Sequence, residues 1–379
     1  MRGHVRERGR GHWYAVIDIR DPVTGKRRRK WHSLPDAKGK RQAEVACAHL
    51  IAEMASGTYL EPARTTVAAF LNHWHAYKRA EISPRSFENY GEVIRNIVPA
   101  IGNVTLLKLQ PAVIAQMYAV ALKRLSPRSV QMMHRLLSQA CKQAVKWQLL
   151  PINPCDAVAA PRVERKQMRV LDADRAAALI EAARGRVMFM PVLLGLMCGL
   201  RRGELAALTW RYVDLDAARM QIVVSAEQTG QGGVRIKPPK SGRSRVVAIP
   251  ALVVEELRRH RIKQAEELLS VGARQSDETC VCLQTDYQPW APRNLSSAFI
   301  KFVLISGVPR VRLHDLRHSH ATHLLAANVH PKIVQERLGH ANIGITMDLY
   351  THVMPGMQDE AASRVDASLR VALGKYYKR

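Results

Sequence analysis

The sequence is poor in acidic residues. Asp and Glu together number 32, against 58 Lys and Arg, and the formal net charge of the 379 residues is +26. The excess of positive charge is +7 over residues 1–60, +8 over residues 61–165 and +11 over residues 166–379. Because every part of the chain is positive, the charge is not that of a basic tail on a neutral enzyme. It indicates a long polyanion as the partner.

Long apolar runs and paired cysteines are also missing. The longest apolar run, residues 187–200, is interrupted by one proline and two glycines, and this argues against a membrane-spanning helix. The arginines near residue 1 are followed by no apolar stretch, so we expect no secretory signal. The six cysteines are scattered, and Cys280 and Cys282 have no second pair. We therefore expect reduced structural thiols in a cytoplasmic protein rather than a zinc site.

The first part of the chain is predicted to be a small α+β unit. Two β-rich segments, 12–20 and 27–34, flank a turn at 21–25, and a helix is expected over residues 37–55. The second strand carries four consecutive basic residues, which are Arg27, Arg28, Arg29 and Lys30. Such a run is ordinarily a solvated face, but a β-ribbon of this kind also fits a DNA groove, so we expect it to contact DNA.

Residues 66–160 have a helical pattern throughout, with helices expected over 67–79, 84–97, 111–123 and 127–148. Two of these helices begin with the same Ser-Pro-Arg-Ser sequence, at 83–86 and 126–129. Ser caps free N–H groups and Pro fits the first turn, so capping alone explains the sequence. The alternative is that Arg85 and Arg128 also bind DNA phosphates at these helix N-termini.

The rest of the chain, after a basic linker, mixes both kinds of element. Strands are expected at 220–224, 234–237 and 245–249, and helices over 173–184, 187–198, 202–208, 252–269, 292–305, 315–327, 331–338 and 343–352. An apolar stripe over 358–373 packs either on its own domain or on a neighbouring copy. The sequence therefore predicts a multidomain, mainly α fold with small β-sheets, divided into residues 1–60, 66–160 and 166–379.

Five short motifs in the last part carry groups suited to phosphate chemistry. They are the Gly-Leu-Arg-Arg-Gly-Glu-Leu of 199–205, Lys240 between two predicted strands, the His-Asp-Leu-Arg of 314–317, the Leu-Gly-His of 338–340, and Tyr350. Such a cationic pocket would bind a phosphodiester and stabilise a pentacovalent transition state. A Tyr beside it would be the nucleophile and a Lys the general acid. No carboxylate cluster accompanies these motifs, which argues against a divalent-metal site.

With these motifs in this order, the chain resembles the tyrosine recombinases, the phage-type integrases, and among them the group with an additional N-terminal domain. The resemblance implies an α+β domain over 1–60 that binds arm-type DNA sites. It further implies an all-α core-binding domain over 66–160 and a mixed α/β catalytic domain over 166–379. It also implies cleavage through a 3′-phosphotyrosine and passage through a Holliday junction, with no metal or other cofactor.

The resemblance gives each motif residue a role. Arg201 and Arg317 would clamp the scissile phosphate, His340 would hold a non-bridging oxygen, and Glu204 would orient the arginine. Arg202 is the alternative to Arg201 as the clamp, but the family pattern favours the first arginine of the pair.

Three further residues would move protons or form bonds. Tyr350 would attack the phosphorus, Lys240 would protonate the 5′-oxygen, and His314 would assist as acid or base. Lys237 is the alternative to Lys240, because alignments slip in hairpins. Zinc is a weaker interpretation of the histidines in this segment, because the helical pitch spreads them around the axis. Those histidines are His314, His318, His320 and His323.

The function expected from the resemblance is that of an integrase of a phage or other mobile element. Its partners would be double-stranded attachment sites and three further copies of itself in a tetramer on DNA, in the cytoplasm of a bacterial cell and associated with the nucleoid. The sequence leaves open the need for a host DNA-bending protein and a directionality factor. The alternatives are a type IB topoisomerase, which relaxes DNA without exchanging sites, and a DNA-binding regulator that has lost catalysis.

Overall fold

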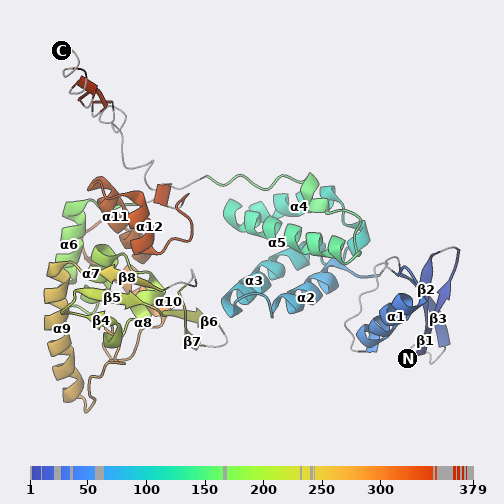
Figure 1. Cartoon of the computed structure of the whole chain (residues 1–379), viewed down its shortest axis with the longest axis horizontal. Coiled ribbons are helices and arrows are strands. Elements are labelled where there is room, and N and C mark those ends of the chain that lie inside the picture. The colour runs from blue at the N-terminus through green and yellow to red at the C-terminus, as the bar shows by residue number, and fades with distance from the viewer. Residues whose placement is uncertain are drawn as a thin grey trace. The chain divides into compact units, whose positions relative to one another are not determined.

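The computed structural model describes residues 2–9, 11–20, 27–34, 37–55, 64–164, 169–230, 233–239, 242, 244–344 and 346–347, with short helical stretches at 362–363, 365–367, 369–370 and 373. The chain divides into two compact units, Met1–Glu164 and Arg165–Arg379 (Figure 1). Across the part of the chain that is described, no helix is both long and apolar enough to cross a membrane.

The N-terminal residues form a three-stranded antiparallel sheet in the order β1-β2-β3, with one helix against it. The elements are β1 (Arg2–Glu7), β2 (Trp13–Arg20), β3 (Arg27–Leu34) and α1 (Lys40–Ala55). Alternate residues of β2, Ala15 and Ile17, face α1 and share a small core with Cys47. The sequence predicts β2 and β3 as a hairpin, but it misses β1, whose RGHVRE sequence is almost wholly polar.

A helical unit follows, built from α2 (Val67–Lys78), α3 (Pro84–Ile101), α4 (Pro111–Leu122) and α5 (Pro127–Lys146), with short 3-10 helices at Leu106–Lys108 and Pro154–Ala157. The Ser-Pro starts act as caps. The Ser83 and Ser126 hydroxyls each accept from a backbone N–H three residues ahead, at 3.3 Å. Phe70 and Trp74 lie at the centre of a separate core formed by these helices.

The second compact unit, Arg165–Arg379, packs helices around two small sheets, whose strand orders are β4-β5-β8 and β6-β7. The strands are β4 (Val213–Asp214), β5 (Arg219–Ile222), β6 (Ser225–Thr229), β7 (Gly233–Lys237) and β8 (Arg245–Ala248). The helices are α6 (Ala173–Ala183), α7 (Phe189–Cys198), α8 (Arg202–Ala207), α9 (Ala251–Ser270), α10 (Pro292–Ile305), α11 (Leu313–Ala326) and α12 (Pro331–Leu338), and a 3-10 helix spans Trp210–Tyr212.

The apolar run of the sequence is α7, which is buried in the core of this unit against α11. Gly195 permits this close packing, because a Cβ there would stand 3.1 Å from Leu316 Cδ1. One expectation needs correction. The strand expected at 220–224 ends at Ile222 and is β5. The polar β6, which the sequence does not predict, follows it and pairs with β7 in another sheet. The last residues of the helix expected over 343–352 lie outside the described residues.

Candidate active site

Arg201 is positioned by the turn between α7 and α8. Gly199 ends α7 with a φ of +68°, and a Cβ there would stand 2.6 Å from both His320 and Leu338, so glycine is required. Glu204, in the first turn of α8, accepts a hydrogen bond from the Arg201 backbone N–H at 2.9 Å. Its carboxylate also accepts from the Arg201 Nη1 at 2.9 Å. The Arg201 guanidinium is therefore held close to its own helix start.

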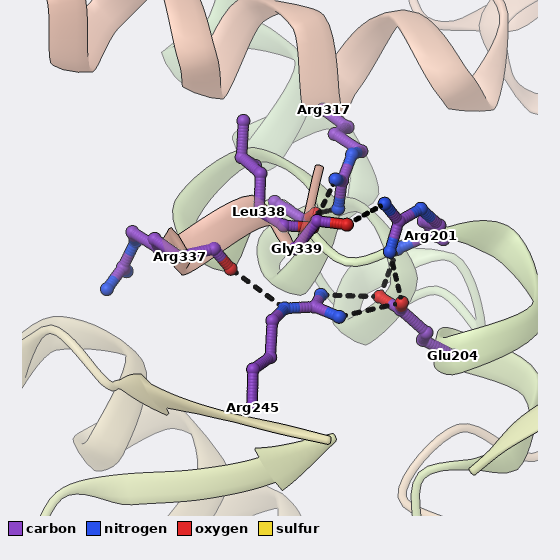
Figure 2. A network of polar contacts seen from close by, with 8 residues as sticks. Arg201, Glu204, Arg245, Arg317, Arg337, Leu338 and Gly339 are labelled. Carbon is purple, nitrogen blue, oxygen red and sulfur yellow. Dashed lines mark hydrogen bonds and ion pairs between the residues drawn. The ribbon is translucent and has the colours of Figure 1, made fainter. Parts of the chain in front are cut away.

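The end of α12 brings three arginines together (Figure 2). Arg245 Nε donates to the carbonyl of residue 337 at 2.8 Å, Arg317 Nη2 donates to the carbonyl of residue 338, and Arg201 Nη2 donates to the carbonyl of residue 339 at 2.7 Å. The last carbonyls of a helix have no partners within it, so each of these three is satisfied by a different guanidinium. Gly339 closes the helix with a φ of +63°.

Arg317, the arginine of the His-x-x-Arg motif, is the member of this cluster that stands on α11. Its Nη1 donates to the Gly199 carbonyl at 2.6 Å, which ties α11 to the turn that carries Arg201. The residue is only 2% exposed. Burial and the charge of Arg201 lower the pKa of Arg317, yet a guanidinium stays protonated in proteins. The charges of Arg317 and Arg201 are thus close enough to repel each other at a largely buried site.

Arg245 is a member of the cluster that motif spacing does not single out. It stands on β8, and its Nη1 and Nη2 donate to the two oxygens of Glu204 at 2.9 and 2.7 Å. The Arg245 and Glu204 side chains are 7% and 1% exposed, so this is a buried, bidentate ion pair. Arg245 stands in the same short segment as Lys240, but its partner Glu204 is 41 residues away in sequence.

A partly buried Arg337 contacts the buried His320 near the end of α12. Arg337 Nε donates to His320 Nε2 at 3.0 Å, and His320 Nδ1 lies 2.8 Å from the Leu196 carbonyl. The carbonyl fixes the proton on Nδ1, so Nε2 is free to accept. Arg337 also donates to the Ala248 carbonyl at 3.0 Å. His320 therefore joins α7, α11 and α12 rather than acting as a metal ligand.

The histidines of the motifs are neutral near pH 7. Burial, then His318 and Arg317, lower the pKa of His314 to about 4. Burial and the charges of Arg317 and Arg201 lower the pKa of His340 to about 3. His340 Nδ1 lies 2.9 Å from the Thr346 hydroxyl, which orients the ring. An anionic ligand would reverse these shifts, because it stabilises the protonated imidazole.

As far as the described residues go, Glu204 is the one carboxylate that pairs with arginines of this cluster, and its partners are Arg201 and Arg245. Burial alone would raise its pKa, but hydrogen bonds and charge from Arg245 and Arg201 outweigh burial and lower the pKa of Glu204 to about 2. Three guanidinium groups against one carboxylate leave a net positive cluster. Such a cluster is suited to a phosphodiester.

Two of the residues predicted to do chemistry, Lys240 and Tyr350, lie outside the described residues. Their roles remain predictions. The residues that flank Lys240 form a turn, in which the Gly242 N–H donates to the Pro239 carbonyl at 2.8 Å. Lys237, the alternative to Lys240, forms an ion pair with Glu227. The alternative acid is therefore already paired.

Arg202, the alternative clamp, is directed elsewhere: its Nη1 donates to Ser296 Oγ on α10 at 3.1 Å. Among the described residues, no group of three or more His, Cys, Asp or Glu side chains is arranged to hold a metal ion. On the histidine-rich α11, the rings of His314 and His318 meet edge to face with their centres 4.7 Å apart, and His323 Nε2 lies 2.7 Å from the Leu171 carbonyl.

The basic residues expected to contact DNA lie in the first unit. On β3, the side chain of Arg29 is exposed and pairs with Asp18 at 3.2 Å, whereas those of Arg27, Arg28 and Lys30 lie outside the described part of the chain. Arg85 pairs with Glu88 at 3.0 Å in the first turn of α3. Arg128 is exposed in the first turn of α5.

Comparison with known proteins agrees with this fold. A family model described as "Phage integrase family" matches residues 169–356, and one described as "Phage integrase, N-terminal SAM-like domain" matches residues 66–119. Together they cover more than half of the chain. An integrase of Streptomyces ambofaciens is 26% identical over 352 residues, which is 90% of this chain and 89% of the relative.

Two solved structures show the same architecture. The Tn1549 transposon integrase, in complex with a circular intermediate DNA, has a TM-score of 0.68 at 18% identity, over 79% of this chain and 99% of that one. A lambda integrase tetramer bound to a Holliday junction has a TM-score of 0.54 at 19% identity, over 89% of this chain and 96% of that one.

Proposed function

Since the chain belongs to the phage integrase family, the tyrosine recombinases, we propose that this site-specific recombinase is the integrase of a phage or another mobile element and that it cuts DNA through a 3′-phosphotyrosine. The observation that carries the proposal is the meeting of Arg201, Arg317 and His340 around the end of α12. In sequence, 138 residues separate Arg201 from the carbonyl that it contacts there. Only the fold brings these motifs together.

Arg201 and Arg317 bind the scissile phosphate. A guanidinium has five N–H groups, and among the described residues Arg201 uses two of them, on Glu204 and on Gly339, which leaves three for a ligand. The Arg201 side chain is 22% exposed, so a phosphate oxygen can reach it. As the pentacovalent transition state gains charge, these fixed donors stabilise it without rearranging.

The bond exchange then runs through the residues that the family resemblance supplies. The Tyr350 oxygen bonds to phosphorus as the bond from phosphorus to the 5′-oxygen breaks. The proton of the Tyr350 hydroxyl passes to a base, for which His314 is the candidate. Lys240 gives its proton to the 5′-oxygen, and His340 holds a non-bridging oxygen. The tyrosyl ester keeps the free energy of the broken phosphodiester. A 5′-hydroxyl from a partner strand can therefore reverse the reaction without nucleotide hydrolysis.

The assembly that we propose for exchange between two attachment sites is a tetramer, which passes through a Holliday junction in the bacterial cytoplasm. The solved lambda integrase tetramer supports this proposal. In this chain, Val365 and Leu369 lie one turn apart on a helical stretch and are 59% and 55% exposed. That stripe supports packing of residues 358–373 on a neighbouring copy rather than on their own unit.

The domains bind different parts of the attachment DNA. Residues 66–160 and 166–379 hold the core site, and residues 1–60 hold the arm sites. On the sheet, Trp31 is 40% exposed, the Arg8 guanidinium lies 4.6 Å from the centre of its ring, and Tyr14 stacks edge to face at 6.2 Å. Aromatic and arginine side chains together suit a DNA-binding face, and the basic run Arg27–Lys30 directly precedes Trp31 in the sequence. Arg85 and Arg128 supply phosphate contacts from the helical unit.

The test starts from covalent capture. Wild-type protein is mixed with fragmented bacterial and element DNA in excess EDTA, quenched with SDS, and the attached fragments are sequenced. Two recovered sites are then placed on one supercoiled plasmid. The proposal predicts recombinant circles with wild type and none with Arg201→Ala. Relaxation without recombinants identifies a topoisomerase instead, and capture that returns only with added magnesium contradicts the cationic mechanism.

A further inference from the structure

We propose that Arg245 is a positioning residue for strand cleavage: it neutralises Glu204 and fixes the end of α12, so that the Arg201 guanidinium stays available to the scissile phosphate. The inference rests on the proposed function, because it concerns how the cleavage site is held. Neither the motifs nor the family comparisons assign Arg245 a role.

Two groups hold Arg201 in place, the Glu204 carboxylate and the Gly339 carbonyl. Arg245 contacts both partners. It binds the carboxylate through two nitrogens, and it packs on Gly339, where an added Cβ would stand 3.1 Å from Arg245 Cδ and 3.3 Å from its Nη1. Its Nε also donates to the carbonyl of residue 337, two residues before that glycine. Arg245 therefore contacts both of the groups that hold the Arg201 guanidinium.

The charge of Arg245 acts in the same direction. Glu204 is almost wholly buried, and a buried carboxylate binds whichever cation is within reach. While Arg245 occupies both carboxylate oxygens, Arg201 donates to one of them through a single side-chain nitrogen. Without Arg245, the carboxylate would be free to pair with Arg201 through both oxygens. That pairing would consume N–H groups that the phosphate needs, and would cancel positive charge where the transition state requires it.

Two substitutions distinguish a positioning role of Arg245 from a role in folding alone. Arg245→Met leaves Glu204 buried with Arg201 as its remaining partner, so cleavage at saturating protein should fall by roughly 100-fold, the scale of a misplaced catalytic group. Adding Glu204→Gln removes the competing charge. The double variant should then cleave at least about tenfold faster than Arg245→Met, because Arg201 is released.

The experiment uses the full-length chain and a nicked suicide duplex of a captured core site. It measures the cleavage rate at saturating protein, duplex affinity and thermal unfolding for each variant. Arg219→Met is the matched control, since Arg219 is exposed on the neighbouring strand β5 and its replacement removes the same charge. Arg245→Lys keeps the charge but lacks the planar guanidinium that donates two parallel hydrogen bonds to the carboxylate. It should unfold close to wild type and still cleave several-fold more slowly.

The outcomes are distinct. Wild type that forms no covalent complex overturns the proposed function itself. If wild type cleaves, the inference stands on slow cleavage by Arg245→Met with duplex affinity unchanged, and on partial recovery in the double variant. Cleavage by Arg245→Met at the rate of Arg219→Met overturns it. So does a double variant that is no faster than Arg245→Met, because Arg245 would then act only through stability.

Discussion

Replacing Gly339 with alanine should damage both stability and cleavage. The residue has a φ of +63°, which L side chains rarely adopt. The new Cβ would stand 3.1 Å from Arg245 Cδ and 3.3 Å from its Nη1. Arg245 cannot easily move away, because it is held by both oxygens of Glu204 and by the carbonyl of residue 337. The strain therefore passes into the contacts that orient Arg201.

The magnitude follows from two parts. The left-handed backbone costs an L residue about 1–2 kcal/mol. Displacing one charged hydrogen bond of Arg245 costs about 1.5–3 kcal/mol more. Gly272 is the matched control: its φ is +76° and nothing lies within 4 Å of an added Cβ, so Gly272→Ala meets only the first cost. For a unit of this size, the second part should separate the two melting temperatures by roughly 3–12 °C.

Thermal unfolding of both variants, beside covalent cleavage of a nicked core-site duplex, measures these effects. We expect Gly339→Ala to melt below Gly272→Ala and to cleave much more slowly at a temperature where both are folded. Gly272→Ala should cleave like wild type. Equal melting temperatures for the two variants, together with unimpaired cleavage by Gly339→Ala, would refute the claim that this turn orients the arginines.

The general acid, the buried His320 and the N-terminal domain can each be tested in the same way. Lys240→Ala should cleave ordinary DNA very slowly and recover on DNA with sulfur at the bridging 5′ position, because a thiolate leaves without a proton; Lys237→Ala, which removes only the pair with Glu227, should resemble wild type on both substrates, and rescue of Lys237→Ala alone would move the acid to that residue. Stability should fall as the pH drops below about 6.5, because burial and Arg337 lower the pKa of folded His320 to about 3, and between these two pH values only the unfolded chain binds the proton. The melting temperature of His320→Gln should therefore decline less than that of wild type between pH 7.5 and pH 5, and an identical decline contradicts the assignment. Deleting residues 1–60, which carry a net +7, should flatten the dependence of log K on log salt for the whole attachment region by about 0.9 for each DNA phosphate that this domain neutralises, and equal slopes would exclude an arm-binding role.

The sequence predicts most helices because their signals are local. Ser83 and Ser126 each cap a helix whose first residue is Pro. The apolar positions of α5 repeat at helical spacing. The strands β1 and β6 are missed because their sequences, RGHVRE and SAEQT, are largely polar. Each forms by pairing with a neighbouring strand, and such pairing is a tertiary fact that no single segment encodes.

The site divides in the same way. Motifs single out Arg201, Arg317 and His340, and the structure brings all three to the end of α12. Arg245 carries no signal of its own in a chain with 58 basic residues, and it is distinguished only by its contact with Glu204 across 41 residues of sequence. The proton donor and the nucleophile are assigned by family resemblance.

The central claim is that Tyr350 forms the bond to DNA, and peptide mapping tests it most directly. Wild-type protein and Tyr350→Phe are incubated with a nicked core-site duplex in EDTA, denatured, and digested with trypsin and nuclease. Trypsin releases residues 338–364, a peptide in which Tyr350 is the one tyrosine. Mass spectrometry should find a 3′-nucleotide on this peptide from wild type, and no nucleotide-linked peptide from Tyr350→Phe, which still binds the duplex. A nucleotide on any other peptide, or a covalent complex formed by Tyr350→Phe, would contradict the account.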